Sequence, residues 1–139
     1  MTQLVRDLMT SNPVALAPNT PVREAARLMR EQDIGDVLVV DDDQLRGIVT
    51  DRDIVVRGVA DRDDLSTCTL NDVCSDQLLT VSSDEPVSAA ITRMREAAVR
   101  RIPVVDKGRP VGVLSIGDAA IERDPSSALA DISVEEGNT

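Results

Sequence analysis

Two short stretches of the sequence place a hydroxyl side chain three residues before an aspartate. In "GIVTDRD" Thr50 precedes Asp53, and in "GVLSIGD" Ser115 precedes Asp118. A hydroxyl at a strand end followed by such an acid is typical of a capping box at the start of a helix. The same groups can bind a ligand, because a hydroxyl and unpaired backbone N–H groups there can receive a phosphate. A carboxylate one turn later can accept hydrogen bonds from the paired hydroxyls of a ribose. The two interpretations are compatible, and the motif alone predicts only the cap.

No catalytic set of side chains stands out. Histidine, the commonest general base, is absent, and so are the glycine-rich phosphate-binding motifs. The three aspartates at 41–43 are able to hold a cation, but we favour a solvated turn. We therefore predict that the protein is not an enzyme and has neither catalytic nor metal-binding residues.

The two cysteines, Cys68 and Cys74, do not indicate a metal site. A structural zinc ion needs four nitrogen or sulfur ligands, and the chain has no histidine to complete the set. A disulfide between them would be unusual in a reducing cytosol. We favour two free thiols in or near a linker, with a redox switch as a less favoured alternative.

Composition restricts the partners. The net charge is −10, from 25 acidic and 15 basic residues, which argues against nucleic acid and anionic membranes as ligands. No aromatic residue is present, so a nucleobase would be held by backbone and aliphatic contacts. No apolar run is long enough to cross a bilayer, and the N-terminus does not resemble a signal peptide. We expect a cytoplasmic protein.

The sequence repeats itself at an offset of 65 residues. "PVREAARLMRE" (21–31) matches "PVSAAITRMRE" (86–96), and "VVD" at 39–41 matches "VVD" at 104–106. No gap is needed from about residue 4 to about residue 123, which indicates two copies of one structural unit. We expect one repeat over 4–60, a polar connector over 61–68, a second repeat over 69–125 and a polar tail over 126–139.

Each repeat predicts the element order β-α-β-β-α, and hence a mixed α+β fold. An extended piece is followed by a helix, a β-branched strand, a tight acidic turn, a second strand and a second helix. Pro21 and Pro86 fit the first helical turn. The apolar positions of the two helices that follow recur at i, i+3, i+4 and i+7, and are Val22, Ala25, Ala26 and Met29, then Val87, Ala90, Ile91 and Met94.

The doubled element order, the "PV" helix starts, "RRIPVVD" and the glycine-to-aspartate signature resemble a pair of CBS domains, named after cystathionine β-synthase and also called a Bateman module. The resemblance covers about residues 4–125. It is strongest to small stand-alone bacterial or archaeal proteins made of one such pair. It implies that the two repeats pack by pseudo-twofold symmetry and leave two related clefts between them.

The resemblance also implies a ligand. Many CBS pairs bind AMP, ADP, ATP, S-adenosylmethionine or NAD in these clefts, without a covalent cofactor. Carried over to this sequence, Asp53 and Asp118 would bind ribose, and Thr50 and Ser115 would face phosphate. Further residues that the family pattern places at the ligand are the adenine-lining segments Ala15–Leu16 and Thr80–Val81, and the phosphate-facing Arg100 and Arg101.

The two repeats differ at these last positions. Gly35 and Asp36 stand where the second repeat has Arg100 and Arg101, and an acid beside a phosphate would repel it. Arg52 either supplies the missing charge or pairs with a surface acid such as Asp51. We therefore expect at most one strong site, using Ser115 and Asp118.

The preferred hypothesis is a regulatory sensor that binds an adenine nucleotide in the interdomain cleft. It would signal through an unidentified effector protein or through its own homodimer, and the apolar helix "DIVVRGVA" supports such an interface. The alternative is a ligand-free, stress-associated interaction scaffold whose signature aspartates are only helix caps.

Overall fold

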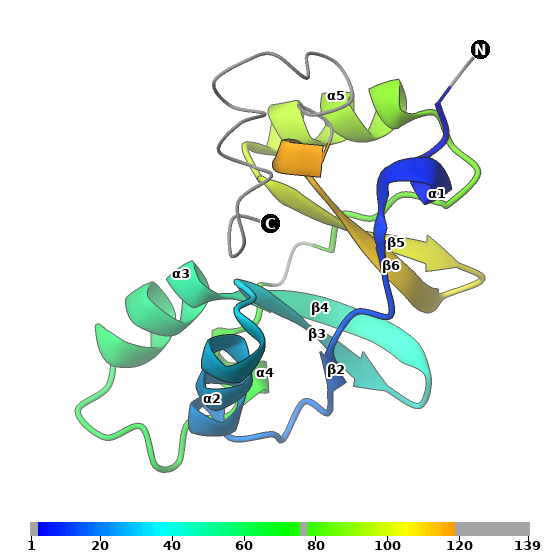
Figure 1. Ribbon diagram of the computed structural model, residues 1–139. Coiled ribbons are helices and arrows are strands. Elements are labelled where there is room, and N and C mark those ends of the chain that lie inside the picture. Colours follow the sequence, from blue (N-terminus) through cyan, green and yellow to red (C-terminus); the bar gives the residue numbers. More distant parts are fainter. Residues whose placement is uncertain (1–2, 76–77, 119–139) are drawn as a thin grey trace. The chain divides into compact units, whose positions relative to one another are not determined.

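The computed structural model describes residues 3–75 and 78–118 (Figure 1). The chain forms two compact units. Val14–Leu78 make up one, here the central unit, and Met1–Pro13 with Leu79–Thr139 make up the other, the terminal unit. The predicted tail and most of the second helix of the second repeat lie outside the described residues. Within the described ranges, no helix combines the length and apolar character that a membrane span requires.

The central unit contains one three-stranded sheet, ordered β2-β3-β4. Strands β2 and β3 are parallel, and β3 and β4 form an antiparallel hairpin. The first nine residues of the predicted second helix, 51–59, are helical, and the last six of these belong to a π-helix. The elements of the central unit in chain order are β2 (Ala15–Leu16), α2 (Val22–Gln32), β3 (Asp36–Asp41), β4 (Gln44–Thr50), α3 (Asp51–Asp53), the π-helix η1 (Ile54–Val59) and α4 (Leu70–Val73).

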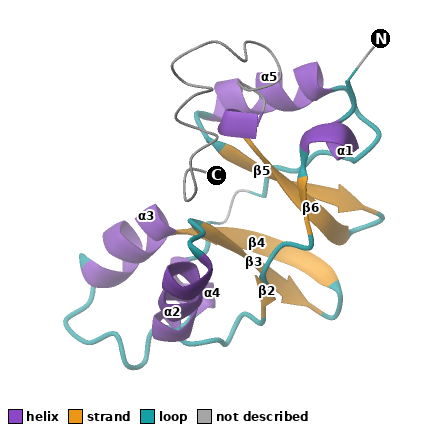
Figure 2. Cartoon of the chain, viewed as in Figure 1, coloured by secondary structure: helices purple, strands orange, loops and turns teal. Residues whose placement is uncertain are grey.

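The terminal unit contains a sheet ordered β1-β6-β5, in which both pairs are antiparallel. The predicted extended piece of the second repeat contributes a single parallel bridge, from Val81 to Val104. The mixture of helices and small sheets (Figure 2) confirms the predicted fold class. The elements of this unit are α1 (Val5–Leu8), β1 (Thr10–Ser11), α5 (Val87–Ala97), β5 (Arg101–Asp106) and β6 (Arg109–Ser115).

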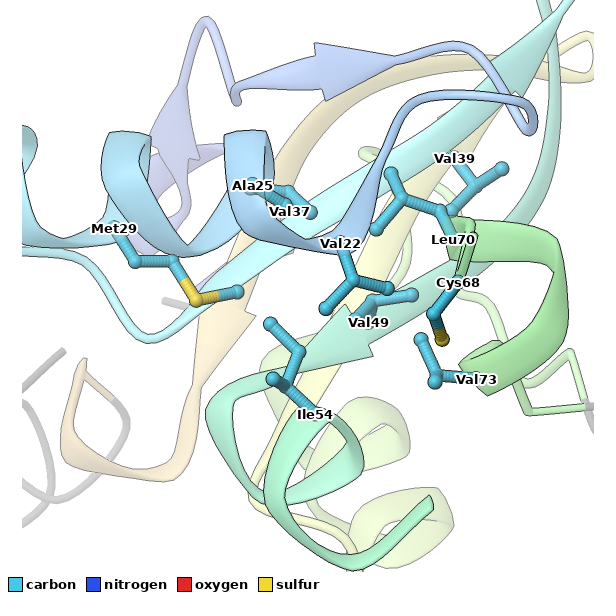
Figure 3. Close-up of a cluster of buried hydrophobic side chains, with 10 residues drawn as sticks. All are labelled: Val22, Ala25, Met29, Val37, Val39, Val49, Ile54, Cys68, Leu70 and Val73. Atoms are coloured by element: carbon cyan, nitrogen blue, oxygen red, sulfur yellow. The ribbon is translucent and has the colours of Figure 1, made fainter. Parts of the chain in front are cut away.

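The core of the central unit lies between its helices and its sheet (Figure 3). The apolar face of α2 was predicted from its spacing, and three of its four positions are buried, but Ala26 is exposed. Pro21 is the N-cap residue of α2, one position before the helical turn predicted for it. The buried cluster comprises Val22, Ala25, Met29, Val37, Val39, Val49, Ile54, Cys68, Leu70 and Val73.

The opening segment of each repeat packs in the other repeat's unit. In the central unit, the Val22 N–H donates to the Cys68 carbonyl at 2.9 Å and the Leu70 N–H donates to the Thr20 carbonyl at 3.0 Å. These bonds bring α4, from the start of the second repeat, against α2 of the first. The compact units therefore do not follow the repeat boundaries expected from the sequence.

The terminal unit shows the same exchange 65 residues away. The Val87 N–H donates to the Gln3 carbonyl at 3.0 Å, and the Val5 N–H donates to the Glu85 carbonyl at 2.9 Å. Val5 is fully buried in the cluster of this unit, together with Met94 of α5. The segment before each repeat's first strand thus completes the core of the unit built around the other repeat.

Candidate functional site

Both hydroxyl–aspartate motifs form closed capping boxes. The Thr50 N–H donates to Asp53 Oδ2 at 2.9 Å, and the Asp53 N–H donates to Thr50 Oγ1 at 3.1 Å. The matching distances are 3.2 Å from the Ser115 N–H to Asp118 Oδ2 and 3.1 Å from the Asp118 N–H to Ser115 Oγ. The cap interpretation is therefore confirmed at both positions.

The boxes do not exhaust the hydrogen-bonding capacity of these side chains. Each box uses one carboxylate oxygen, and an ionised carboxylate has two oxygens with about four acceptor positions. The hydroxyls accept within the box and keep their own O–H as a donor. Asp53, Asp118 and Thr50 are half-buried, whereas Ser115 is 6% exposed. Capping and ligand binding can thus occur at the same residues.

The glycine that opens each motif lies where the exchanged segment crosses the strand. A Cβ at Gly112 would lie 2.8 Å from the Thr10 carbonyl oxygen and 2.7 Å from Met9 Sδ. At Gly47 it would collide with Cys74 Sγ. The sequence showed the glycines as part of the signature but gave no reason for them, because the crossing segment comes from the other repeat.

The predicted phosphate-facing arginines lie beside the second motif. Arg101 is the cross-strand partner of Ser115 in the β5–β6 ladder. The carbonyl of Arg100 accepts the Ile116 N–H at 2.8 Å. Arg100 is exposed and Arg101 is half-buried. The terminal unit therefore brings Ser115, Asp118 and the two arginine positions together at one end of its sheet.

The central unit has the same backbone arrangement with different side chains. Asp36 is the cross-strand partner of Thr50, and the Gly35 carbonyl accepts the Asp51 N–H at 3.0 Å. Arg52 is exposed. Its backbone N–H donates to Asp51 Oδ1 at 2.8 Å, and in the described part of the chain no ion pair joins the Arg52 and Asp51 side chains.

The two segments predicted to line the adenine are held differently. Ala15 and Leu16 form β2, an edge strand paired with Leu38 and Val39 of β3. Val81 is buried, its N–H donates to the Pro103 carbonyl at 3.1 Å, and its carbonyl accepts the Val105 N–H at 2.8 Å. Thr80, which is half-buried, is therefore the residue of the Thr80–Val81 pair better placed to face a base.

The Thr80 carbonyl is held by Arg93, which forms an ion pair with Glu85 that the sequence pattern did not indicate. Arg93 Nη1 donates to the Thr80 carbonyl at 3.1 Å and to Glu85 Oε2 at 2.8 Å, and Nη2 donates to Glu85 Oε1 at 2.6 Å. The hydrogen bonds from Arg93, and then that from the Ser82 N–H, lower the pKa of Glu85. The one hint in the sequence is a difference between the repeats, because the first repeat has Thr20 and Leu28 at the positions that match Glu85 and Arg93.

The two cysteines, Cys68 and Cys74, are not joined in a disulfide. Cys68, expected in or near a linker, is fully buried in the core of the central unit, and Cys74 is half-buried. The aspartates at 41–43 span the β3–β4 hairpin turn and are exposed. Among residues 3–75 and 78–118, no three His, Cys, Asp or Glu side chains are grouped so that they could hold a metal ion.

Comparison with known proteins places this chain among others of the same architecture. The "CBS domain-containing protein YhcV" of Bacillus subtilis (strain 168) is 34% identical over 133 residues, which cover 93% of this chain and 94% of YhcV. "Hypoxic response protein 1" of Mycobacterium tuberculosis (strain ATCC 25618 / H37Rv) is 35% identical over 116 residues, 83% of this chain and 81% of that protein.

Solved structures with the same fold include two proteins that are also similar in sequence. The CBS domain pair of protein MJ0100, in complex with 5-methylthioadenosine and S-adenosyl-L-methionine, superposes with a TM-score of 0.82 at 26% identity, covering 91% of this chain and all of that one (100%). Hypoxic Response Protein I with two coordinated zinc ions gives a TM-score of 0.77 at 34% identity, covering 85% of this chain and 97% of that one. The CBS domain model matches residues 5–60 and 70–123, so the chain belongs to the CBS domain family as a tandem pair.

Proposed function

We propose that this CBS pair is a regulatory sensor that binds an adenosine-containing nucleotide of the AMP, ADP and ATP class at the Ser115–Asp118 motif of its terminal unit. The observation that carries the proposal is the pairing of Arg101 with Ser115 across β5 and β6. It places an arginine, whose guanidinium suits a phosphate group, across the ladder from a motif whose hydroxyl and carboxylate suit phosphate and ribose. Binding would act as a population shift between conformations read by an unidentified effector protein.

Two further observations support this choice. The MJ0100 pair was solved with two adenosine-containing ligands, and S-adenosylmethionine or NAD therefore stay in the candidate set for this chain. The absence of aromatic residues is compatible with a base held by backbone and aliphatic contacts. We propose no catalytic activity and no metal, and a cytoplasmic location remains a prediction.

A direct test uses the composition of the chain. Because the protein has no Trp, Tyr or Phe, its own near-ultraviolet absorbance is very small, and any bound nucleotide dominates the spectrum. Equilibrium dialysis against AMP, ADP and ATP should leave excess base absorbance with the protein for at least one of them. Equal absorbance on both sides of the membrane for all three nucleotides would reject the proposal.

The closed capping boxes favour a second candidate, a ligand-free interaction scaffold. In that case Asp53 and Asp118 act only as caps, and the output is a protein contact. The two candidates differ in the response of stability to nucleotide, which the scaffold does not predict.

We also propose that the protein forms a homodimer through the helix that follows Thr50. Val55, Val56 and Val59 are 59%, 46% and 53% exposed on α3–η1, and a second copy would bring the same apolar face to a twofold interface. Val56→Glu should therefore convert a dimer into a monomer in analytical ultracentrifugation. Val99→Glu, at a 38% exposed valine of the terminal unit, is the control and should leave the dimer intact. A monomeric wild type would contradict the proposal.

A further inference from the structure

We propose that Arg93 is a positioning residue for the nucleotide base in the terminal unit, and that it acts through the backbone carbonyl of Thr80. The inference rests on the proposed function, since it concerns the segment that would face the base. It adds a specificity element that lies outside the hydroxyl–aspartate motif.

The contact geometry restricts Arg93 to one orientation. Its Nη1 and Nη2 atoms donate to the two carboxylate oxygens of Glu85 at 2.8 and 2.6 Å, and Nη1 also donates to the Thr80 carbonyl at 3.1 Å. A bidentate pair of this kind fixes the plane of the guanidinium. Thr80 cannot turn its carbonyl away without losing a charge-assisted hydrogen bond.

The residues that follow Thr80 are held as well. The Val81 N–H donates to the Pro103 carbonyl at 3.1 Å, so one residue is fixed by strand β5. The next two are fixed by acidic side chains. The Ser82 N–H donates to Glu85 Oε2 at 2.7 Å, and the N–H and Oγ of Ser83 donate to the Asp106 carboxylate at 3.0 and 2.6 Å.

The central unit holds its matching segment without a counterpart of the Glu85–Arg93 pair, here called the clamp. There the equivalent residues Ala15 and Leu16 pair with β3 as a regular parallel strand, whereas Val81 makes one isolated bridge. The positions that match Glu85 and Arg93 are Thr20 and Leu28. The clamp therefore belongs to the unit that also carries the two arginines beside its motif. In that unit a side-chain tether adds to the backbone hydrogen bonds of Val81.

A fixed backbone carbonyl can discriminate between purine bases. Adenine presents an amino donor at the position where guanine presents a carbonyl acceptor. A carbonyl oxygen held in place can accept a hydrogen bond from the adenine amino group, whereas it repels the guanine carbonyl. It has a second lone pair for the base while it accepts from Arg93. A site built around such a hydrogen bond rejects a base that cannot make it. If the tether is cut, the carbonyl can rotate and the preference for adenine falls.

The experiment compares the wild type with Arg93→Leu, which installs the residue found at the matching position 28. Arg95→Leu removes the same charge from an exposed position of the same helix and serves as the control. Calorimetric titrations with AMP and GMP should show AMP binding weakened about tenfold in Arg93→Leu, a loss of about 1.4 kcal/mol. GMP binding should be little changed, so the AMP-over-GMP preference falls by a similar factor. Arg95→Leu should match the wild type.

A second measurement is independent of nucleotide. Amide hydrogen exchange of the ligand-free protein should speed up at Val81 and Ser82 in Arg93→Leu but not in Arg95→Leu, because the tether holds this segment closed. Arg93→Lys, which keeps the charge but cannot form the bidentate fork, should be intermediate in both measurements. It also replaces Arg93→Leu if that variant does not fold.

The possible failures are distinguishable. If the wild type prefers AMP and both leucine variants keep that preference, the role of Arg93 is rejected and the proposed function stands. Unchanged amide exchange in Arg93→Leu rejects the tether itself. If the wild type binds none of AMP, ADP and ATP, the proposed function fails and this inference falls with it.

Discussion

Replacing Leu70 by alanine is expected to lower the free energy of unfolding by about 2 to 5 kcal/mol. Leu70 is fully buried and belongs to the core of the central unit, where it lies with Val22 and Val49 (Figure 3). Truncation removes apolar contacts and leaves a cavity that the surrounding strands and helices can only partly fill. Chemical denaturation of both proteins measures the difference.

The control for this variant is Leu78→Ala. Leu78 is 44% exposed, and exposed substitutions usually change stability by less than about 0.5 kcal/mol. Equal effects of the two substitutions would show that α4 is not part of the core of the central unit. Such a result would remove the basis for the exchange of opening segments between the repeats.

The second large effect is expected from Asp118→Ala in the presence of nucleotide. A ligand at a hundredfold excess over its dissociation constant adds about 2.7 kcal/mol to stability. Asp118→Ala should abolish this gain, because its carboxylate would bind the ribose hydroxyls. Without nucleotide, the variant should lose only the cap, which is worth about 1 kcal/mol. Thermal unfolding with and without nucleotide separates the two contributions.

Asp53→Ala is the matched control, because Asp53 closes the same capping box in the central unit. It should cost a similar cap energy while keeping most of the nucleotide-dependent gain. If Asp118→Ala and Asp53→Ala both keep the full gain, the two aspartates are caps only, and the scaffold becomes the better explanation.

Much of the local structure could be predicted from the sequence, because periodicity reports which face of an element is buried. The spacing of Val22, Ala25 and Met29 predicted one face of α2, and all three are buried. Ala26 is exposed, since a small side chain at the margin of a helical face need not reach the core. The β-branched runs predicted the strands β3 and β5 in the same way.

The partners of those faces could not be predicted. The polar sequence around Cys68 indicated a connector, yet Cys68 is fully buried beside α2. Periodicity says that a face needs covering but does not say which segment covers it, so the exchange of α1 and α4 between the repeats was not foreseen. The reason for Gly112, which lies against Thr10, depends on that exchange.

At the candidate site, the residue types were visible but their geometry was not. The spacing of Ser115 and Asp118 predicted the capping box that the structure contains. Sequence could not assign Arg101 to a particular motif, because cross-strand register is set by the hairpin. The clamp formed by Glu85 and Arg93 joins residues eight positions apart through a turn and a helix, a separation that no simple pattern singles out.

The most direct test of the sensor function is a thermal-unfolding panel on the wild type with AMP, ADP, ATP, S-adenosylmethionine and NAD, repeated with Asp118→Ala. One or more of these ligands should raise the unfolding temperature of the wild type by several degrees. The same ligand should have no effect on Asp118→Ala. A wild-type unfolding temperature that none of the five ligands changes would contradict nucleotide sensing and would direct the search to protein partners.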